Sequence, residues 1–208
     1  MTVPLTVAPG LRGDLTVPAY AIGVVVFAHG SGSSRRSARN IAVARELQDN
    51  RFGTLLFDLL SADEDDGDRR FDIPLLTERL RAAVAELANH EHAARLPIGL
   101  FGASTGAAAA LRTAAAEGER VRAVVSRGGR PDLAGDALPR VRCPTLLIVG
   151  ERDPEVLRLN RDASGELGGP HELRVVPGAT HLFEEAGALE TVAGLAAAWF
   201  GDHVPRDR

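Results

Sequence analysis

Short apolar segments recur along the chain, and their lack of polar alternation predicts strands covered on both faces. These segments lie at residues 24–28, 54–57, 98–101, 123–125, 145–149 and 173–176. Apolar residues at helical spacing lie between or after them, as in Ile41, Ala44 and Leu47; Leu76, Leu80, Ala83, Val84 and Leu87; and Leu189, Val192, Leu195, Ala196 and Trp199. Alternating strands and helices predict an α/β fold with a doubly wound, mostly parallel sheet that has helices on both faces. The segment before Gly23 is expected to add an antiparallel hairpin or edge.

Composition narrows the class of protein. The 208 residues, 45% of them hydrophobic and 25% charged, suffice for one core, so we expect a single domain over residues 1–208. The 24 basic and 28 acidic residues give a formal charge of −4, which provides no polycationic surface for nucleic acid. Every basic residue is arginine, which excludes Schiff-base chemistry on lysine. With one cysteine and no apolar run of membrane-spanning length, we expect a cytoplasmic protein that makes no membrane contact.

A candidate nucleophile lies in Gly102-Ala103-Ser104-Thr105-Gly106, which joins the apolar segment 98–101 to an alanine-rich helical segment. Gly-x-Ser-x-Gly between a strand and a helix is typical of a nucleophile elbow, because the two glycines permit a sharp turn. Such a turn would place the Ser104 hydroxyl at a helix N-terminus, where free N–H groups favour a developing oxyanion. The five-residue motif by itself fits an ordinary turn equally well.

Two polar residues after later strands favour the nucleophile elbow over an ordinary turn. Asp153 follows the apolar segment 145–149, and His181 follows the segment 173–176. The order serine, acid, histidine is that of the α/β-hydrolase triad. We therefore predict that Ser104 is the nucleophile, His181 the general base and Asp153 the residue that orients and stabilises the imidazole.

The sequence His29-Gly30-Ser31-Gly32 follows the segment 24–28, and its glycines allow backbone N–H groups to approach a bound carbonyl oxygen. We assign the oxyanion hole to the N–H groups of Ser31 and Thr105. His29 is expected to brace this loop, because the base must follow the acid in this topology.

Together these motifs resemble the dienelactone-hydrolase-like branch of the α/β hydrolases, over nearly the whole chain from Leu11 to Phe200. The resemblance is strongest to a subgroup of small bacterial hydrolases, some of which are fused behind a phosphoribosyltransferase domain. The segments that carry it are His29–Ser34, Thr54–Leu60, Phe101–Ala107, Ser126–Leu133 and Gly178–Phe183.

This resemblance implies an α/β-hydrolase fold and a catalytic triad. It implies no cap domain, because family members with a lid insert it where only residues 126–144 stand here. The chain departs from the dienelactone hydrolases at the nucleophile, which is a cysteine in those enzymes and Ser104 here. The single Cys143 precedes a different strand and is expected to pack as a small apolar residue. Dienelactone is therefore not implied as the substrate.

Four arginines are expected on loops beside the site, namely Arg35, Arg36, Arg127 and Arg130. Guanidinium groups there would hold a substrate carboxylate or phosphate. The alternative is that they are solvated, or paired with Asp132 and Asp136. The acidic segment Asp63, Glu64, Asp65, Asp66 and Asp68 lacks the spacing of a calcium loop and is expected to be a solvated loop.

The sequence thus predicts a serine hydrolase that cleaves a small carboxylic ester, thioester or lactone through an acyl-enzyme, without a metal or organic cofactor. Its expected partner is a small ester-type substrate. The same triad would also serve a serine aminopeptidase or an acyltransferase. A protein of this fold would alternatively act without turnover, as a binding or regulatory partner of a phosphoribosyltransferase. The oligomeric state and the natural substrate are left open.

Overall fold

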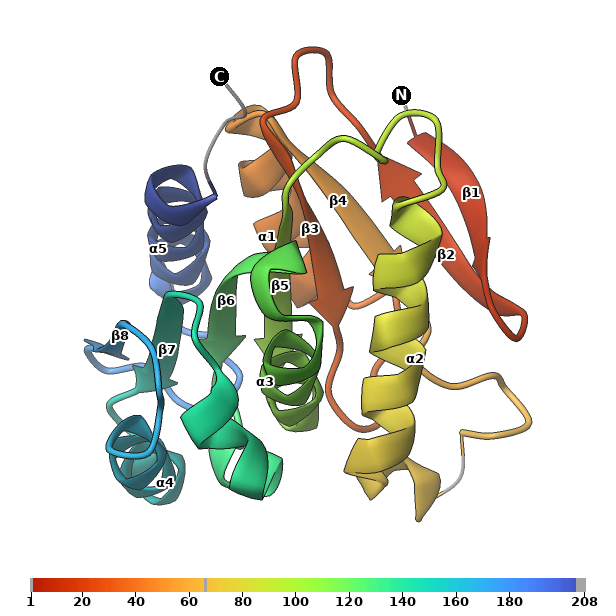
Figure 1. Ribbon diagram of the computed structural model, residues 1–208. Coiled ribbons are helices and arrows are strands. Elements are labelled where there is room, and N and C mark those ends of the chain that lie inside the picture. The colour runs from red at the N-terminus through yellow and green to blue at the C-terminus, as the bar shows by residue number, and fades with distance from the viewer. Residues whose placement is uncertain (1, 66, 205–208) are drawn as a thin grey trace.

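The computed structural model describes residues 2–65 and 67–204, and the strands in those ranges form one eight-stranded sheet (Figure 1). The strands are β1 (Thr2–Val7), β2 (Leu11–Thr16), β3 (Gly23–Ala28), β4 (Phe52–Phe57), β5 (Ile98–Ala103), β6 (Val121–Arg127), β7 (Thr145–Gly150) and β8 (His171–Val176). Their order is β1-β2-β4-β3-β5-β6-β7-β8, in which the strands from β3 to β8 run parallel. The expected doubly wound, mostly parallel sheet is confirmed.

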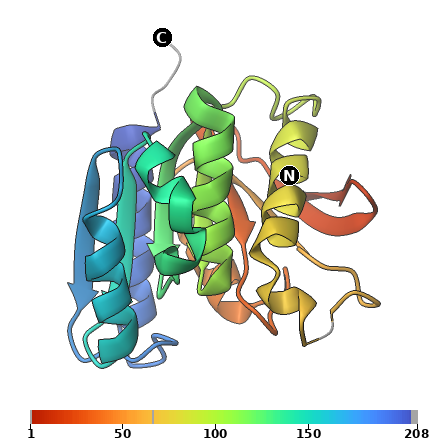
Figure 2. The same cartoon turned by 60° about the horizontal axis from the view of Figure 1, so that its bottom comes forward.

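Helices cover both faces of this sheet, as predicted (Figures 1 and 2). The α-helices are α1 (Ala38–Asp49), α2 (Ile73–Leu87), α3 (Thr105–Glu117), α4 (Pro154–Ser164) and α5 (Ala188–His203), and short 3₁₀ segments are η1 (Arg69–Phe71), η2 (Gly118–Arg120) and η3 (Pro131–Arg140). Helices α1 and α5 pack together on one face, and α2, α3 and α4 lie on the other. Side chains cap the N-termini of α1 and α2. The Ser37 hydroxyl accepts a hydrogen bond from the Asn40 N–H, and the Asp72 carboxylate accepts one from the Leu75 N–H.

The apolar core is divided by the sheet. Strands β3, β4, β5 and β7 are buried at every residue, as their unbroken apolar sequences predict. Under α1 and α5 the largest buried side chains are aromatic, with the rings of Phe27 and Phe101 4.9 Å apart between centroids. Each such side chain contributes roughly 1.5–3 kcal/mol by leaving water. The other face is filled mainly by leucine, valine and alanine.

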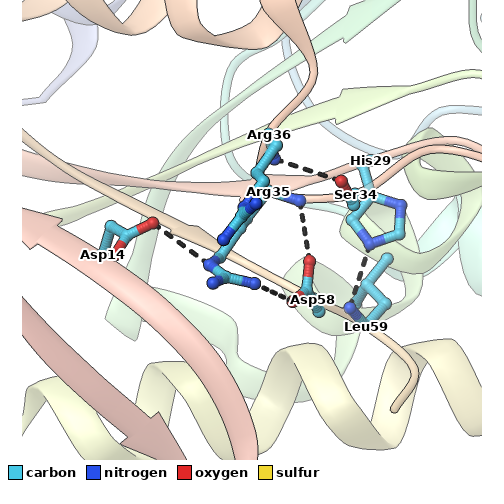
Figure 3. A network of polar contacts seen from close by, with 7 residues as sticks. All are labelled: Asp14, His29, Ser34, Arg35, Arg36, Asp58 and Leu59. Carbon is cyan, nitrogen blue, oxygen red and sulfur yellow. Dashed lines mark hydrogen bonds and ion pairs between the residues drawn. The ribbon is translucent and has the colours of Figure 1, made fainter. Parts of the chain in front are cut away.

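The segment before Gly23 forms the hairpin expected from the sequence. Strands β1 and β2 pair antiparallel, and β2 joins the main sheet by pairing antiparallel with β4, with Leu15 opposite Leu55. The hairpin therefore extends one edge of the sheet and carries Asp14 toward the loop that follows β3 (Figures 1 and 3).

The connection from β6 to β7 contains only the short segment η3, so no cap domain is inserted there. The carboxyl ends of β3, β5, β6 and β7 therefore reach a common edge without a lid from that connection, at the bottom of Figure 1. None of the helices in residues 2–65 and 67–204 combines the length and the apolar character that a membrane crossing requires.

Candidate active site

Ser104 occupies a sharp turn between β5 and α3. Its backbone has φ 51° and ψ −122°, a conformation that costs a non-glycine residue on the order of 1–3 kcal/mol. Neighbouring backbone holds the turn in place: the Ser104 N–H donates to the Arg127 carbonyl at 3.2 Å, and the Ser104 carbonyl accepts from the Arg130 N–H at 3.1 Å. The elbow is therefore fixed by the end of β6 and the loop that follows it.

The two glycines of the motif are required by close backbone approach. A Cβ atom at Gly102 would lie 2.4 Å from the Ala107 Cα, and one at Gly106 would lie 2.2 Å from the Ala28 carbonyl oxygen. Real Cβ atoms do not approach other atoms this closely. A side chain at Gly106 would push α3 away from β3, and one at Gly102 would push it away from the preceding strand, β5. Glycine thus brings the first turn of α3 directly against the end of β3.

Asp153 and His181 form the second part of the site. Asp153 is the N-cap residue of α4, but its carboxylate makes no capping hydrogen bond; Oδ2 instead lies 2.6 Å from His181 Nδ1. With Nδ1 donating to this carboxylate, a neutral imidazole has its free lone pair on Nε2. The Asp153 side chain is 15% exposed and that of His181 is 39% exposed, so the ring remains accessible while the acid is shielded.

The end of β6 contacts both His181 and the backbone of Ser104. Gly128 lies against the imidazole, since a Cβ atom there would be 3.5 Å from His181 Nδ1, and the adjacent Arg127 binds the Ser104 backbone. Among the described residues no hydrogen bond joins Ser104 to His181 directly. The three predicted triad residues nevertheless follow β5, β7 and β8 at one edge of the sheet.

The loop that carries His181 is held by residues that the sequence did not indicate. The Glu185 carboxylate accepts hydrogen bonds from both the N–H (3.1 Å) and the hydroxyl (2.6 Å) of Thr180. These bonds, the hydroxyl's above all, lower the pKa of Glu185. Arg39 of α1 binds Glu184 at 3.2 Å across 145 positions of sequence. No local motif marks either contact.

The loop after β3 is braced as predicted for His29 (Figure 3). His29 Nε2 accepts a hydrogen bond from the Leu59 N–H, and Nδ1 donates to the Gly30 carbonyl, both at 3.0 Å. Burial lowers the pKa of His29, because the charged ring would lose its hydration, so the ring is neutral and accepts through Nε2. The structural role expected for His29 is confirmed.

The predicted oxyanion donors lie next to each other. The Ser31 N–H donates to the Thr105 hydroxyl at 3.1 Å, which ties the loop after β3 to the first residue of α3. The N–H groups in the first turn of a helix have no partner within the helix, so the Thr105 N–H is available to an incoming oxygen. Both donors are therefore adjacent to the Ser104 elbow.

The four arginines have different surroundings. Arg35 binds Asp14 (3.2 Å) and, through both its guanidinium and its backbone, Asp58 (Figure 3). Arg130 makes a bidentate pair with Asp132 at 2.8 and 2.9 Å, and Arg36 is exposed. Arg127 is the last residue of β6 and not part of a loop, because the strand continues two residues beyond its apolar segment.

In the acidic segment, Asp63 and Asp68 are exposed, as expected for a solvated loop, whereas Glu64 and Asp65 are paired with arginines. Glu64 lies 2.9 Å from Arg79 and 3.4 Å from Arg69, and Asp65 lies 2.7 Å from Arg70. Asp66 lies outside the described residues. Cys143 is partly buried against the core, and burial raises the pKa of its thiol to about 11. The expectation that it packs as a small apolar residue is confirmed.

Comparison with known proteins supplies the family context. Residues 21–191 match the family described as an alpha/beta hydrolase domain. The crystal structure of a dienelactone hydrolase from Anabaena variabilis is 49% identical, with a TM-score of 0.94 over 99% of this chain and 98% of that one. Est1E from Butyrivibrio proteoclasticus has a TM-score of 0.81 at 16% identity, over 97% of this chain and 98% of that one, which shows the fold alone.

A curated relative from Mycobacterium tuberculosis, named as a phosphoribosyl transferase, is 58% identical over 195 residues. Those residues are 93% of this chain but 44% of the relative, so the chain spans less than half the length of that protein.

Proposed function

The chain belongs to the α/β hydrolase family, and from that premise we propose that it is a serine hydrolase which cleaves a small carboxylic ester, thioester or lactone. The observation that carries the proposal is the 2.6 Å contact between Asp153 Oδ2 and His181 Nδ1, beside a serine in a strained strand-to-helix turn. Such a turn is expected where a nucleophile must stand clear of its own backbone.

In the proposed reaction, the Ser104 oxygen attacks the substrate carbonyl while His181 Nε2 takes its proton. Collapse of the tetrahedral intermediate expels the alcohol or thiol, which receives that proton from His181, and leaves an acyl group on Ser104. Water then attacks the acyl-enzyme with His181 again as base, and releases the acid. Asp153 keeps Nδ1 protonated and stabilises the imidazolium that forms in each half of the reaction.

The N–H groups of Ser31 and Thr105 are the proposed oxyanion hole. The hydrogen bond from the Ser31 N–H to the Thr105 hydroxyl places the two donors side by side, and an incoming oxyanion would replace that hydroxyl as the acceptor of the Ser31 N–H. The Thr105 N–H is the donor that needs no change of partner when negative charge develops.

The open surroundings of the site favour a small substrate. The hollow beside Ser31 has a volume of only about 10 Å³ and is lined by leucines together with the charged residues Asp65 and Arg70, so it has room for about one water-sized group. The open β6–β7 connection supports a shallow site without a lid.

We also propose that residues 1–208 act as one domain, because a single sheet carries the apolar clusters on both of its faces. The transferase name of the mycobacterial relative belongs to a protein of more than twice this length. For this chain, the elbow and the Asp153–His181 pair support hydrolysis.

A fluorophosphonate probe tests the proposal directly. It should add one mass increment on the peptide that contains Ser104, and Ser104→Ala should abolish labelling and lower ester hydrolysis by about 10³-fold or more. Cys143→Ser is the control and should retain turnover. If the Ser104→Ala protein hydrolyses short-chain esters, thioesters and lactones at the wild-type rate, Ser104 is not the nucleophile. A panel of those three substrate classes then identifies the preferred bond.

A further inference from the structure

Two arginines beside the site have N–H groups without a partner. Arg127 at the end of β6 is 9% exposed, and its buried Nη1 has no hydrogen-bond acceptor among the described residues. Its guanidinium lies 6.0 Å from the centre of the Phe101 ring. Arg39 in the first turn of α1 binds Glu184 through Nη1, but its buried Nε also has no described acceptor. Buried donors without acceptors are rare in folded proteins, so these two require an explanation.

The charges of this pair are not balanced. Arg39 is compensated by Glu184, whereas no carboxylate of the described residues lies within ion-pair distance of Arg127. Burial, and then repulsion from Arg39, lowers the pKa of Arg127 to about 10, so the group stays protonated at neutral pH in surroundings that disfavour its charge. Arg35 and Arg130, by contrast, are each held by carboxylates. The pair therefore lacks one negative charge.

The backbone at Arg127 and the loop that binds Arg39 both adjoin the proposed reacting groups. The Arg127 carbonyl binds the Ser104 N–H, and the next residue, Gly128, lies against the His181 ring. Glu184, the partner of Arg39, is three residues beyond His181. Arg39 also lines a cleft of about 490 Å³ together with Ser31, the proposed oxyanion donor. The carboxylate of Asp65 on the same cleft is paired with Arg70.

We propose that Arg127 and Arg39 form a binding site for an anionic oxygen group of the substrate, so that the enzyme prefers esters with a remote carboxylate or phosphate. The free N–H groups of the two side chains supply the donors, and the bound anion supplies the missing charge. This inference rests on the proposed hydrolase function. Arg39 was not among the arginines that the sequence indicated, because its proximity to Arg127 arises only from the packing of α1 against the sheet.

Three aryl esters of equal acyl length test the site, one ending in a carboxylate, one in a phosphate monoester and one in a neutral amide. At least one charged ester should exceed the amide by roughly 10- to 100-fold in kcat/KM, as expected for charge-assisted hydrogen bonds. The better of the two charged esters identifies the anion. Arg127→Met, which retains a long side chain over Phe101, and Arg39→Gln should each reduce the charged-to-neutral ratio toward one. Arg45→Gln, an exposed arginine on the same helix, is the matched control and should leave the ratio unchanged.

Binding measurements separate this inference from the proposed reaction. Calorimetric titration of the Ser104→Ala protein with glutarate, with phenyl phosphate and with neutral glutaramide needs no turnover. Anion binding that disappears when Arg39→Gln is added supports the site even if no ester is hydrolysed. Equal kcat/KM for charged and neutral esters in the wild type overturns the inference. A charged-to-neutral ratio that Arg39→Gln leaves unchanged also overturns it. Because Arg39 is partly exposed, Arg39→Gln remains a usable test if Arg127→Met does not fold.

Discussion

A single methyl group added at Gly106 would test the packing that shapes the nucleophile elbow. In Gly106→Ala the new Cβ would lie 2.2 Å from the Ala28 carbonyl oxygen and 2.5 Å from that of His29. Both are backbone atoms of β3 and its following loop, which cannot rotate away as a side chain would. The first turn of α3 must therefore move by about 1 Å to restore ordinary contact.

The cost follows from two opposing terms. Overpacking against rigid surroundings costs up to about 3 kcal/mol, and alanine regains roughly 1 kcal/mol of helix propensity over glycine. The net loss is up to about 2 kcal/mol, or a fall of up to about 4–8 °C in Tm for a chain of this length. The same shift would separate the Thr105 N–H from the Ser31 N–H, and a 1 Å misplacement of catalytic groups lowers turnover by about 10²-fold.

Gly194→Ala is the matched control, since Gly194 is exposed in α5 and a Cβ atom there meets nothing within 4 Å. That variant gains helix propensity without a clash, so its Tm should rise by about 1–4 °C with turnover unchanged. Thermal unfolding and ester hydrolysis are measured on both proteins. If Gly106→Ala matches Gly194→Ala in both measurements, close packing at the elbow does not determine its geometry.

Three further predictions concern single side chains. Asp153→Asn should lower hydrolysis by about 10⁴-fold with little change in Tm, because the amide favours the wrong imidazole tautomer; loss of less than tenfold would remove Asp153 from the triad. Because burial lowers the pKa of folded His29, its stabilising contribution is complete above about pH 6.5 and decreases as pH falls through that value, by at most about 1.4 kcal/mol per pH unit. Urea unfolding between pH 5 and pH 8 should therefore show a shallower pH dependence for His29→Gln than for the wild type, and equal slopes would contradict the assignment. With its thiol pKa raised to about 11, Cys143 should react with iodoacetamide at pH 8 about 100-fold more slowly in the folded protein than in urea.

Much of the fold follows from local sequence. The apolar segments 24–28 and 98–101 became β3 and β5 with only small changes at their ends, because strands buried on both faces contain few polar residues. Strand β6 extends past its apolar segment to include Ser126 and Arg127. These residues are buried in the sheet, but their polar side chains gave no sign of a strand. Helix α4 was not expected, because its buried side presents few apolar residues and includes Asn160, whose amide binds the Gly129 carbonyl.

The site was predictable to the extent that its chemistry lies in local motifs. The elbow and the order of Ser104, Asp153 and His181 are readable because Ser104 directly follows β5, and Asp153 and His181 lie in the loops after β7 and β8. The partners of the arginines are not readable, since Arg35 binds Asp14 of the hairpin and Arg39 binds Glu184 at the far end of the chain. Such contacts depend on which strands become neighbours and on the direction of each side chain.

The temperature at which activity is lost is expected to depend on the edge hairpin, although the hairpin contains no proposed triad residue. Edge strands open more readily than central ones, in local unfolding events whose free energy is smaller than that of the whole domain. When β2 detaches from β4, Arg35 loses Asp14, one of the two carboxylates that hold it in the loop after β3. Ser31 lies in that same loop, so its position becomes less ordered while the central strands remain intact. On heating, hydrolysis is therefore expected to decline before the sheet melts, and hydrogen exchange in β1 and β2 should rise over the same temperature range.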